Sequence, residues 1–289
     1  MVRIIGLGGL LVVLGWPVAV AAAPVAPPRP AATGAAEVEA LAVASLTFQQ
    51  WCEAKDDLPE GQRHTVEVLL HELGVENCAL AARRASVVRL LNLSYQGLTD
   101  IEPLASWPQV TDLLLHNNAI QDLRPLAHLP NLTRLYLSHN QISDLTPLAA
   151  LDQLQILSLA NNPLASLEGL ETLTALEELH LSQTQTHDLT ALAPLAQINT
   201  LYLNQNHITD LTPLASLSAL EVLDLSSNQV ETLTPLLALD NLRHLNLNRN
   251  RVHNTSILRA LPNLSQVYLY NNPVNRAGCP TNATTLCLI

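Results

Sequence analysis

Residues 132–153 read LTRLYLSHNQISDLTPLAALDQ, and this 22-residue pattern occurs eight times in succession between residues 88 and 263, without an insertion or a deletion. A ninth copy begins at Leu264 and ends after Pro273. Repeats of this length stack on one another, and each buries its apolar face against its neighbours. The pattern therefore predicts an elongated solenoid, whose regular surface is better suited to binding than to catalysis.

The strand of each repeat is indicated by two leucines at alternating positions. Numbered from the residue that opens each copy, positions 4 and 6 are nearly always leucine, as at Leu135 and Leu137. Alternation predicts a short strand with both leucines facing inward. Because the rest of each repeat leads from one strand to the next, the strands are expected to pair in parallel.

Position 9 is asparagine in seven of the nine copies, with Gln96 and Thr184 as the exceptions. A buried asparagine side chain can satisfy backbone groups of its own turn and of the neighbouring turn. The sequence therefore predicts an asparagine ladder made of Asn118, Asn140, Asn162, Asn206, Asn228, Asn250 and Asn272.

A turn sequence recurs on the expected outer side of the repeats. Position 13 is often aspartate and precedes Leu-Thr-Pro-Leu, as at Asp144. This order predicts a short 3₁₀ turn with the aspartate as its cap and the proline stiffening it. The aspartates are Asp100, Asp122, Asp144, Asp188 and Asp210, and the prolines are Pro103, Pro125, Pro147, Pro213 and Pro235.

The first 23 residues are expected to be an export signal, with Arg3 before the apolar run Ile4–Val20 and a small-x-small cleavage site at Ala19-Val20-Ala21. An uncleaved anchor is the alternative, but the run is short for a membrane span and contains glycine and proline. Residues 24–36 are rich in proline and alanine and are expected to be a linker. We therefore expect an exported protein, periplasmic or secreted, without a membrane span after signal removal.

Residues 37–87 are expected to form a helical cap before the array. Thr47 and Gln50 match a capping box, with Ser45 as the alternative cap, for a helix that runs to Lys55. Residues 56–61 are expected to be a turn, and a second helix with apolar residues at helical spacing is expected to end at Gly74. A third short helix is predicted over about residues 77–84.

Four cysteines are present, and an even number in an exported chain indicates disulfides. Two precede the array and two follow it, and an elongated stack would hold these pairs apart. We therefore predict the bonds Cys52–Cys78 and Cys279–Cys287, the second within a C-terminal cap at residues 274–289. Zinc is the alternative, but neither spacing is typical of a zinc site. No metal and no cofactor are expected.

The motif L-x-x-L-x-L-x-x-N-x-I-x-D-L-x-P-L-x-x-L resembles the 22-residue leucine-rich repeat of the internalin family over residues 88–273. The resemblance implies an α/β solenoid with a parallel β-sheet on the concave face, 3₁₀ turns on the convex face and a helical cap before the array. The chain resembles more closely exported bacterial leucine-rich repeat proteins with a W-C…T-V-x-x-L-L…C cap and a C-P…C ending. The matching residues are Trp51-Cys52, Thr65–Leu70, Cys78, Cys279-Pro280 and Cys287.

Positions 3, 5 and 7 are expected to face outward from the concave sheet. Four of the five tyrosines occupy positions 5 and 7, where packing does not require them. Tyrosine among serine, asparagine and histidine is typical of a recognition surface, although strand propensity alone also favours aromatic residues there. The predicted partner-contacting residues are Arg134 and Glu178 at position 3; Tyr136, His180, Tyr202, Asp224, Asn246 and Tyr268 at position 5; and His116 and Tyr270 at position 7.

Two groups of residues on this face contain side chains of the kind that could form a chemical site. Ser158, His180 and Glu178 would be near neighbours, but Glu178 shares a strand with His180, about 7 Å away between Cα atoms, and no glycine-rich turn offers an oxyanion site. His116 and His139 lie on adjacent rungs, but two ligands without a third make a weak metal site. The sequence therefore indicates a protein that is not an enzyme.

The net charge of −11 argues against nucleic acid or an anionic membrane as the main partner. Basic residues gather near Arg243 and acidic residues near Glu221, which suggests either ordinary solvated charge or a polarised docking face. The expected function is recognition of a protein partner by a monomer, through the concave face and outside the cytoplasm. The alternatives are a glycan or cell-wall binder that stacks sugars on its tyrosines, and a structural spacer of the cell envelope.

Overall fold

The computed structural model describes residues 46–274, 279 and 286–288, all within one unit that spans Ala40–Ile289. The predicted signal at residues 1–23, the predicted linker at residues 24–36 and the beginning of the predicted cap lie outside the described residues. Most of the predicted C-terminal segment lies outside them as well. Among the described residues, no helix has the length and apolar character needed to cross a membrane.

The cap before the array consists of three helices and a 3₁₀ turn: α2 (Phe48–Glu53), η1 (Lys55–Asp57), α3 (Glu60–Leu73) and α4 (Cys78–Ala85). Thr47 and Gln50 form the predicted capping box of α2. Gly74 ends α3 in the left-handed conformation, as predicted, with φ of 63°. The predicted turn over residues 56–61 was wrong at its end, because Pro59 occupies the N-cap of α3 and helix begins at Glu60. Proline has no N–H to leave unpaired there, and an acidic first residue favours a helix N-terminus.

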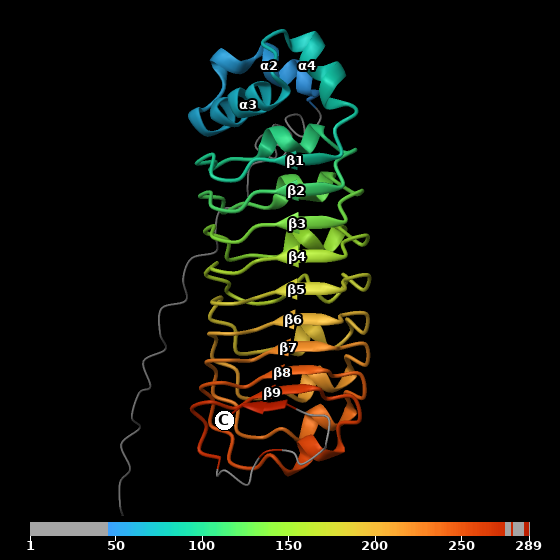
Figure 1. Ribbon diagram of the computed structural model, residues 1–289. Helices are drawn as coiled ribbons and strands as arrows, with labels where there is room; N and C mark the ends of the chain where they lie inside the picture. The colour runs from blue at the N-terminus through green and yellow to red at the C-terminus, as the bar shows by residue number, and fades with distance from the viewer. Residues whose placement is uncertain (1–45, 275–278, 280–285, 289) are drawn as a thin grey trace, which may run out of the picture. The chain divides into compact units, whose positions relative to one another are not determined.

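Ten short parallel strands form one sheet in chain order within the described residues (Figure 1). Each residue of β1 to β9 pairs with the residue 22 positions away, as Leu91 does with Leu113. The leucines at positions 4 and 6 are buried, so the predicted strand, its inward face and its parallel pairing are confirmed. The strands are β1 (Leu90–Asn92), β2 (Asp112–Leu114), β3 (Arg134–Tyr136), β4 (Ile156–Ser158), β5 (Glu178–His180), β6 (Thr200–Tyr202), β7 (Val222–Asp224), β8 (His244–Asn246), β9 (Gln266–Tyr268) and β10 (Leu286–Leu288).

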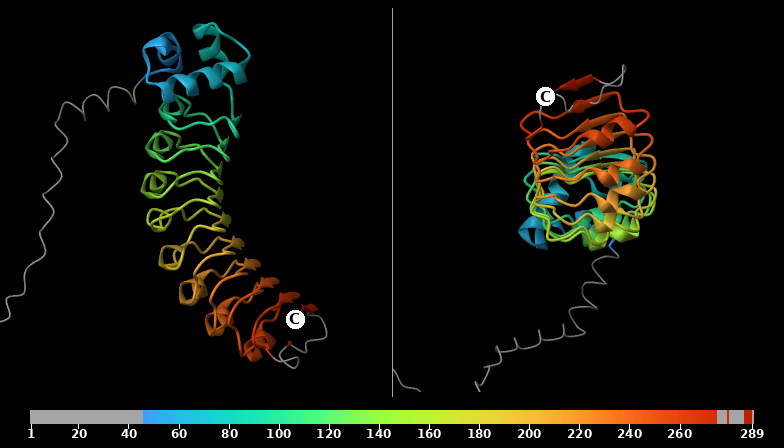
Figure 2. Two further views of the ribbon diagram at one scale, coloured as in Figure 1. Left: turned by 90° about the vertical axis from the view of Figure 1, so that its left-hand side faces the viewer. Right: turned by 90° about the horizontal axis from the view of Figure 1, so that it is seen from below.

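The 3₁₀ turns form a second column on the opposite side of the repeats. Figure 2 shows the strands along the inner side of the curved array and these turns along its outer side. The turns are η2 (Glu102–Ser106), η3 (Arg124–His128), η4 (Thr146–Ala150), η5 (Thr190–Leu192), η6 (Thr212–Ser216), η7 (Thr234–Ala238) and η8 (Ser256–Ala260). The chain between β4 and β5 has no such turn.

The position 13 aspartates bind these turns, but not from the N-cap itself. The N-cap of η4 is Leu145, and its side chain makes no capping bond. Asp144 stands one residue earlier and accepts the backbone N–H of Thr146 at 2.9 Å. The predicted cap is therefore an Asx turn that satisfies the first N–H of the 3₁₀ turn, one residue away from the predicted place.

The predicted asparagine ladder is confirmed by its hydrogen bonds. Asn140 donates from Nδ2 to the carbonyl of Leu137 at 2.8 Å and to that of Leu115, in the preceding repeat, at 3.0 Å. Its Oδ1 accepts the backbone N–H of Ile120 at 3.1 Å. At the exception Thr184, the hydroxyl donates to Leu181 at 2.8 Å and so replaces one bond of an asparagine.

Position 8 has left-handed backbone in all nine copies, and no copy has glycine there. The side chains at this position vary widely, so no sequence signal marked the conformation. Left-handed backbone costs about 1–2 kcal/mol for a residue with a Cβ atom, least for asparagine. The nine residues, with φ between 57° and 61°, are Tyr95, Asn117, His139, Asn161, Gln183, Gln205, Ser227, Arg249 and Asn271.

Helix α3 joins the cap to the first repeat through close polar contacts. Thr65 donates its hydroxyl to the carbonyl of Asp100 at 2.5 Å, and His64 Nε2 lies 2.7 Å from the carbonyl of Gln96. Trp107 replaces the usual leucine at position 20 and meets Phe48 of α2 edge-on, with 5.0 Å between the ring centroids. The cap therefore covers the leucine face that the first repeat would otherwise expose.

Both predicted disulfides are present. Cys52–Cys78 joins α2 to α4, with 5.5 Å between the Cα atoms. Cys279–Cys287 closes the other end, with 5.8 Å between the Cα atoms. The sequence did not predict that Cys287 lies in a strand, β10, which pairs with β9 and continues its register. The C-terminal disulfide therefore attaches a tenth rung to the sheet.

Candidate functional site: the concave sheet face

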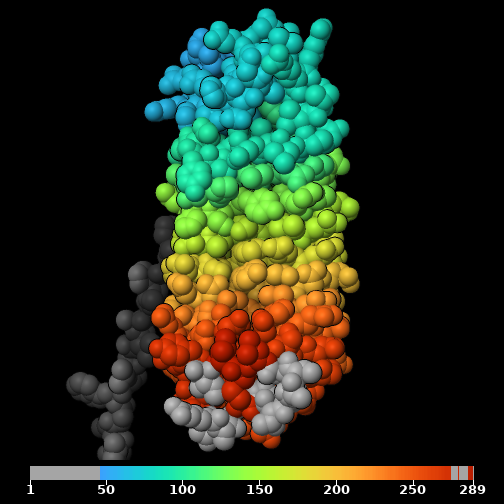
Figure 3. All heavy atoms as spheres, in the orientation of Figure 1, coloured from blue at the N-terminus to red at the C-terminus, as the bar shows by residue number. Residues whose placement is uncertain are grey.

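The predicted partner-contacting residues all lie on the strand side of the array. Figure 3 views this side, where the side chains of successive repeats form one continuous surface. Arg134 and Tyr270 are exposed, while the other predicted residues are half-buried between their neighbours on adjacent rungs. The half-burial arises because strands of a parallel sheet are only about 4.8 Å apart, so that long side chains cover one another. The face is thus packed along its length and open toward solvent.

The centre of the face carries three side chains in contact. His180 Nε2 lies 2.6 Å from Glu178 Oε1. The His180 ring stacks on the Tyr202 ring of the next rung, with 4.6 Å between centroids and 23° between planes. The distance of about 7 Å expected between Glu178 and His180 is a distance between Cα atoms. Their side chains come into contact because both extend from the same face of the strand. We call Glu178, His180 and Tyr202 the central cluster.

Ser158 does not join this cluster. Its hydroxyl lies 2.7 Å from the hydroxyl of Ser138, on the preceding rung. It is also only 8% exposed, although position 5 was expected to face solvent. His180 directs Nε2 to Glu178, so the nominal nucleophile–base–acid arrangement of the sequence is not assembled.

The two histidines on adjacent rungs, His116 and His139, have separate partners. His116 Nδ1 lies 3.0 Å from the Ser94 hydroxyl, and the His116 ring meets Tyr95 edge-on. His139 Nε2 lies 3.3 Å from the side-chain nitrogen of Asn161. Within the described part of the chain, no three histidine, cysteine or acidic residues gather closely enough to hold a metal ion.

A polar network runs along the C-terminal half of the face. Asn246 donates from Nδ2 to Asp224 Oδ2 at 3.0 Å, and Asp224 Oδ1 accepts the backbone N–H of Ser226 at 2.8 Å. Asn248 Oδ1 accepts the backbone N–H of Tyr270 at 2.8 Å. These bonds hold the side chains in fixed orientations before any partner arrives, which lowers the entropy lost on binding.

Ion pairs join neighbouring repeats at two places. Arg134 Nε lies 2.7 Å from Asp112 Oδ1, one rung before it. Arg243 Nε lies 3.1 Å from Glu221 Oε2 at the start of the neighbouring strands. The second pair joins a residue of the basic group to a residue of the acidic group that the sequence analysis described. The charges of Arg243 and Glu221 are therefore paired with each other, which agrees better with ordinary surface charge than with a polarised docking face.

Strand β10 adds two residues that the sequence did not assign to this face. Leu286 pairs in register with Gln266, and Leu288 with Tyr268, so the two leucines continue positions 3 and 5. They are 53% and 44% exposed, beside Tyr270 at 56%. The Leu-Cys-Leu alternation was the available signal, but three residues outside the repeat are too few to predict a strand. The C-terminal end of the face is therefore apolar and aromatic.

The family description "Leucine Rich repeats (2 copies)" matches residues 108–150, 152–194 and 197–238. No curated protein sequence matches the chain. Among solved structures, an internalin (inlF) from Listeria monocytogenes str. 4b F2365 is 28% identical with a TM-score of 0.67, over 71% of this chain and 62% of that one. This chain thus aligns with less than two thirds of that structure's length.

An internalin C2 (inlC2) from the same Listeria strain is 29% identical with a TM-score of 0.57, over 78% of this chain and 91% of that one. A TDR receptor is 18% identical with a TM-score of 0.59, over 68% of this chain and 37% of that one, which shows the fold alone. The repeat match, the parallel sheet with its 3₁₀ turns and the two internalin structures agree with one another. The chain has the leucine-rich repeat fold, and it is similar to repeat proteins of the internalin type.

Proposed function

We propose that this protein is a non-enzymatic binding module that recognises a protein partner through its concave face, outside the cytoplasm. The observation that carries the proposal is the central cluster, in which Glu178 and Tyr202 hold the His180 ring between them on an open face. A rigid aromatic anchor surrounded by oriented polar groups is the usual composition of an interface hot spot. Leucine-rich repeat proteins of this kind serve as protein-interaction modules.

The size of the face favours a macromolecule. Ten strands, at about 4.8 Å each, give a sheet roughly 40 Å long. The predicted contact residues extend from His116 on the second repeat to Tyr270 on the ninth. A footprint of that length matches a protein domain or an extended chain better than a small metabolite, which usually requires a concave pocket.

Two observations support a binding role rather than catalysis. Ser158 bonds to Ser138 and not to the His180–Glu178 pair. The concave face is open, whereas catalytic groups generally act in a site that excludes water. The export part of the proposal is supported by the two disulfides, which persist in oxidising compartments.

The proposal is tested by photo-crosslinking in the native cell envelope. A photoreactive residue replaces Tyr202, and a matched control carries it at Thr212, on the outer side of the same repeat. We expect Tyr202 to give a discrete crosslinked protein that mass spectrometry identifies, and Thr212 not to give it. Identical products from both positions would contradict the use of the concave face.

A substitution at Tyr202 also distinguishes a protein partner from a glycan partner. Retention of the chain on peptidoglycan or on a glycan array, abolished by Tyr202→Ala, would replace the protein partner with a glycan. If substitutions across the concave face change no partner and no phenotype, the structural spacer replaces both. Crosslinks to a cytoplasmic protein would contradict the proposed location.

A further inference from the structure

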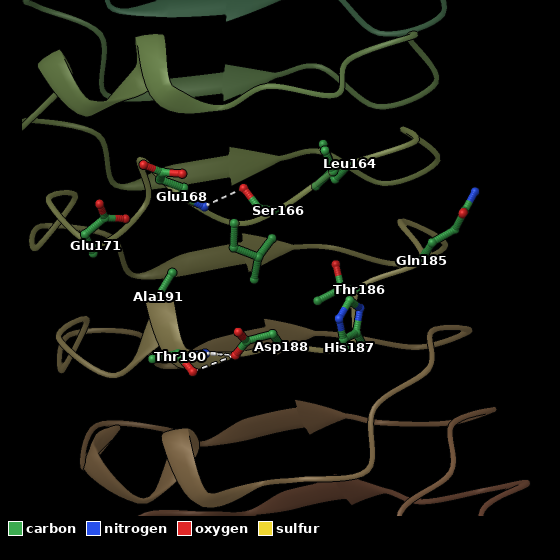
Figure 4. A pocket seen from close by; sticks show the side chains of 12 residues that line it. Leu164, Ser166, Glu168, Glu171, Gln185, Thr186, His187, Asp188, Thr190 and Ala191 are labelled. Carbon is green, nitrogen blue, oxygen red and sulfur yellow. Dashed lines mark hydrogen bonds between the residues drawn. The ribbon is translucent and has the colours of Figure 1, made fainter. Parts of the chain in front are cut away.

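The outer side of the array carries a hollow between the fourth and fifth repeats, away from the concave face (Figure 4). Its volume is about 670 Å³, and it is open to solvent on one side. Leu164 and Leu167 form its apolar floor, at 9% and 5% exposure. The hollow interrupts an otherwise regular column of 3₁₀ turns, so its cause can be sought in the two repeats that border it.

The first cause is a missing backbone hydrogen bond. In regular repeats the N–H of position 10 donates to the carbonyl of position 11 in the preceding repeat, as Gln229 does to Ile208 at 2.9 Å. Position 10 of the fourth repeat is Pro163, which has no N–H. Ala165 instead donates to Ser143 of the third repeat at 2.9 Å.

The second cause is a close approach on the side of the third repeat. Gly169 has φ of +99°, and a Cβ atom there would lie 2.6 Å from the carbonyl oxygen of Leu145. The fourth outer segment therefore lies directly on the backbone of the third repeat and forms no 3₁₀ turn. On the fifth repeat, Ala191 stands where five of the other repeats have proline. The space thus opens between the fourth and fifth repeats.

The lining has one sign of charge besides its apolar floor. Glu168, Glu171 and Asp188 stand at its edges, with His187 beside them and no lysine or arginine among the lining residues. Glu171 Oε2 accepts the N–H of Gly169 at 2.8 Å, and Asp188 Oδ1 accepts the N–H of Thr190 at 2.9 Å. In both carboxylates the structure uses one oxygen for its own turn, and the other oxygen can accept from a ligand.

We propose that this hollow binds a small organic cation with an apolar body. The ammonium or guanidinium group would lie against Glu168, Glu171 and Asp188, and the apolar part would cover Leu164 and Leu167. A volume of about 670 Å³ lies within the range of pockets for small molecules. Apolar contact supplies affinity, and the carboxylates select a cation over a neutral or anionic relative.

The first experiment compares three probes of similar size on the full chain by calorimetry and ligand-observed NMR. Phenethylamine is the cation, 2-phenylethanol its neutral relative and phenylacetate the anion. We expect the amine to bind at least about tenfold more tightly than the alcohol, a difference of about 1.4 kcal/mol, and more weakly as salt is added. Equal binding of amine and alcohol, or no amine binding at millimolar concentration, would overturn the proposal.

The second experiment uses a matched pair of variants. Asp188 and Asp210 bind their turns in the same way, each accepting the N–H and the hydroxyl of the threonine two residues later. Only Asp188 lines the hollow. We expect Asp188→Asn to weaken amine binding several-fold and Asp210→Asn to leave it unchanged. Equal losses in both variants would place the binding elsewhere.

A third variant, Ala191→Leu, places a larger side chain in the hollow. It should abolish amine binding while circular dichroism shows a folded chain, and retained binding would contradict the site. If this variant does not fold, the Asp188→Asn and Asp210→Asn comparison still decides the proposal. Photo-crosslinking from Tyr202 is independent of these measurements. The proposal for the concave face and the proposal for the outer hollow can therefore be refuted separately.

Discussion

Asn206 donates from its side-chain Nδ2 to the carbonyl oxygen of Leu181, in the preceding repeat, at 2.7 Å. The same side chain donates to Leu203 and accepts the backbone N–H groups of Thr184 and Thr186. Asn206→Ala would leave the N–H groups of Thr184 and Thr186 without this acceptor, each at a cost of about 1–3 kcal/mol. The carbonyls of Leu181 and Leu203 would keep the bonds that they accept from the Thr184 hydroxyl and from Asn228 Nδ2. We expect a loss of about 2–4 kcal/mol in the free energy of unfolding, measured with urea.

The control is Asn204→Ala, on the half-buried concave surface two residues earlier. It should cost less than about 1 kcal/mol because it is not part of the ladder. Comparable losses at both sites would show that the ladder does not contribute as proposed.

The left-handed backbone at position 8 predicts that glycine stabilises the array there. Gln205 has φ of 58°. Glycine adopts this conformation without strain, so Gln205→Gly should raise the free energy of unfolding by about 0.5–1 kcal/mol despite the entropy of the unfolded chain. Gln205→Val should lower the free energy of unfolding by at least about 1 kcal/mol. The matched change Asn204→Gly, at a residue without left-handed backbone, should lower the free energy of unfolding. If it raised this free energy instead, the left-handed backbone would not explain the effect of Gln205→Gly.

The repeat made most of the fold predictable, because a period of 22 residues determines which side chains face inward and which strands are neighbours. The asparagine ladder followed from the same period. The contact between His180 and Glu178 could not be predicted, since it depends on side-chain conformations and not on spacing. Strand β10 has no repeat around it, and the left-handed position 8 accepts six residue types. The outer hollow arises from Pro163 and Gly169, whose effect depends on the backbone of the adjoining repeats.

Gly169 offers a sharp test of the outer backbone packing. A Cβ atom at this residue would lie 2.6 Å from the Leu145 oxygen and 2.8 Å from the Thr146 Cα atom. Gly169→Ala should therefore lower the free energy of unfolding by about 2–3 kcal/mol, through steric overlap and strain at positive φ. Gly97→Ala is the control, because Gly97 also has positive φ but nothing within 4 Å of the added atom. Its cost should be about 1 kcal/mol, and the difference between the two reports the steric term.

The disulfide of the cap predicts where the array first opens. Cys52–Cys78 closes a loop with a sequence separation of 26, for which a stabilisation of about 3 kcal/mol is typical. In the double variant Cys52→Ser/Cys78→Ser, hydrogen exchange should rise first in α2 and α4 and last in the middle strands. A uniform rise across β1 to β9 would show instead that cap and array unfold as a single unit.

Glu102 and Asp122, on neighbouring outer turns, predict opposite dependences on pH. Burial, followed by the charges of Asp100 and Asp122, raises the pKa of Glu102. Its contribution to stability is therefore present at low pH and is lost as pH rises through the raised pKa. The side-chain hydrogen bond from Arg124 lowers the pKa of Asp122, so its contribution is present above the ordinary carboxyl pKa and is lost as pH falls through the lowered value.

Glu102→Gln should therefore stabilise the protein at pH 7, and this gain should disappear by pH 3. Asp122→Asn should destabilise it at pH 7, and this loss should shrink toward the same pH. Both effects should stay below about 1 kcal/mol, because solvent screens these partly exposed groups. Urea unfolding at pH 3, 5 and 7 measures them, and Asp144→Asn, on the next outer turn, serves as a control for loss of the Asx turn alone. If Glu102→Gln and Asp122→Asn shift stability in the same direction at pH 7, the assigned causes of the two pKa shifts are wrong.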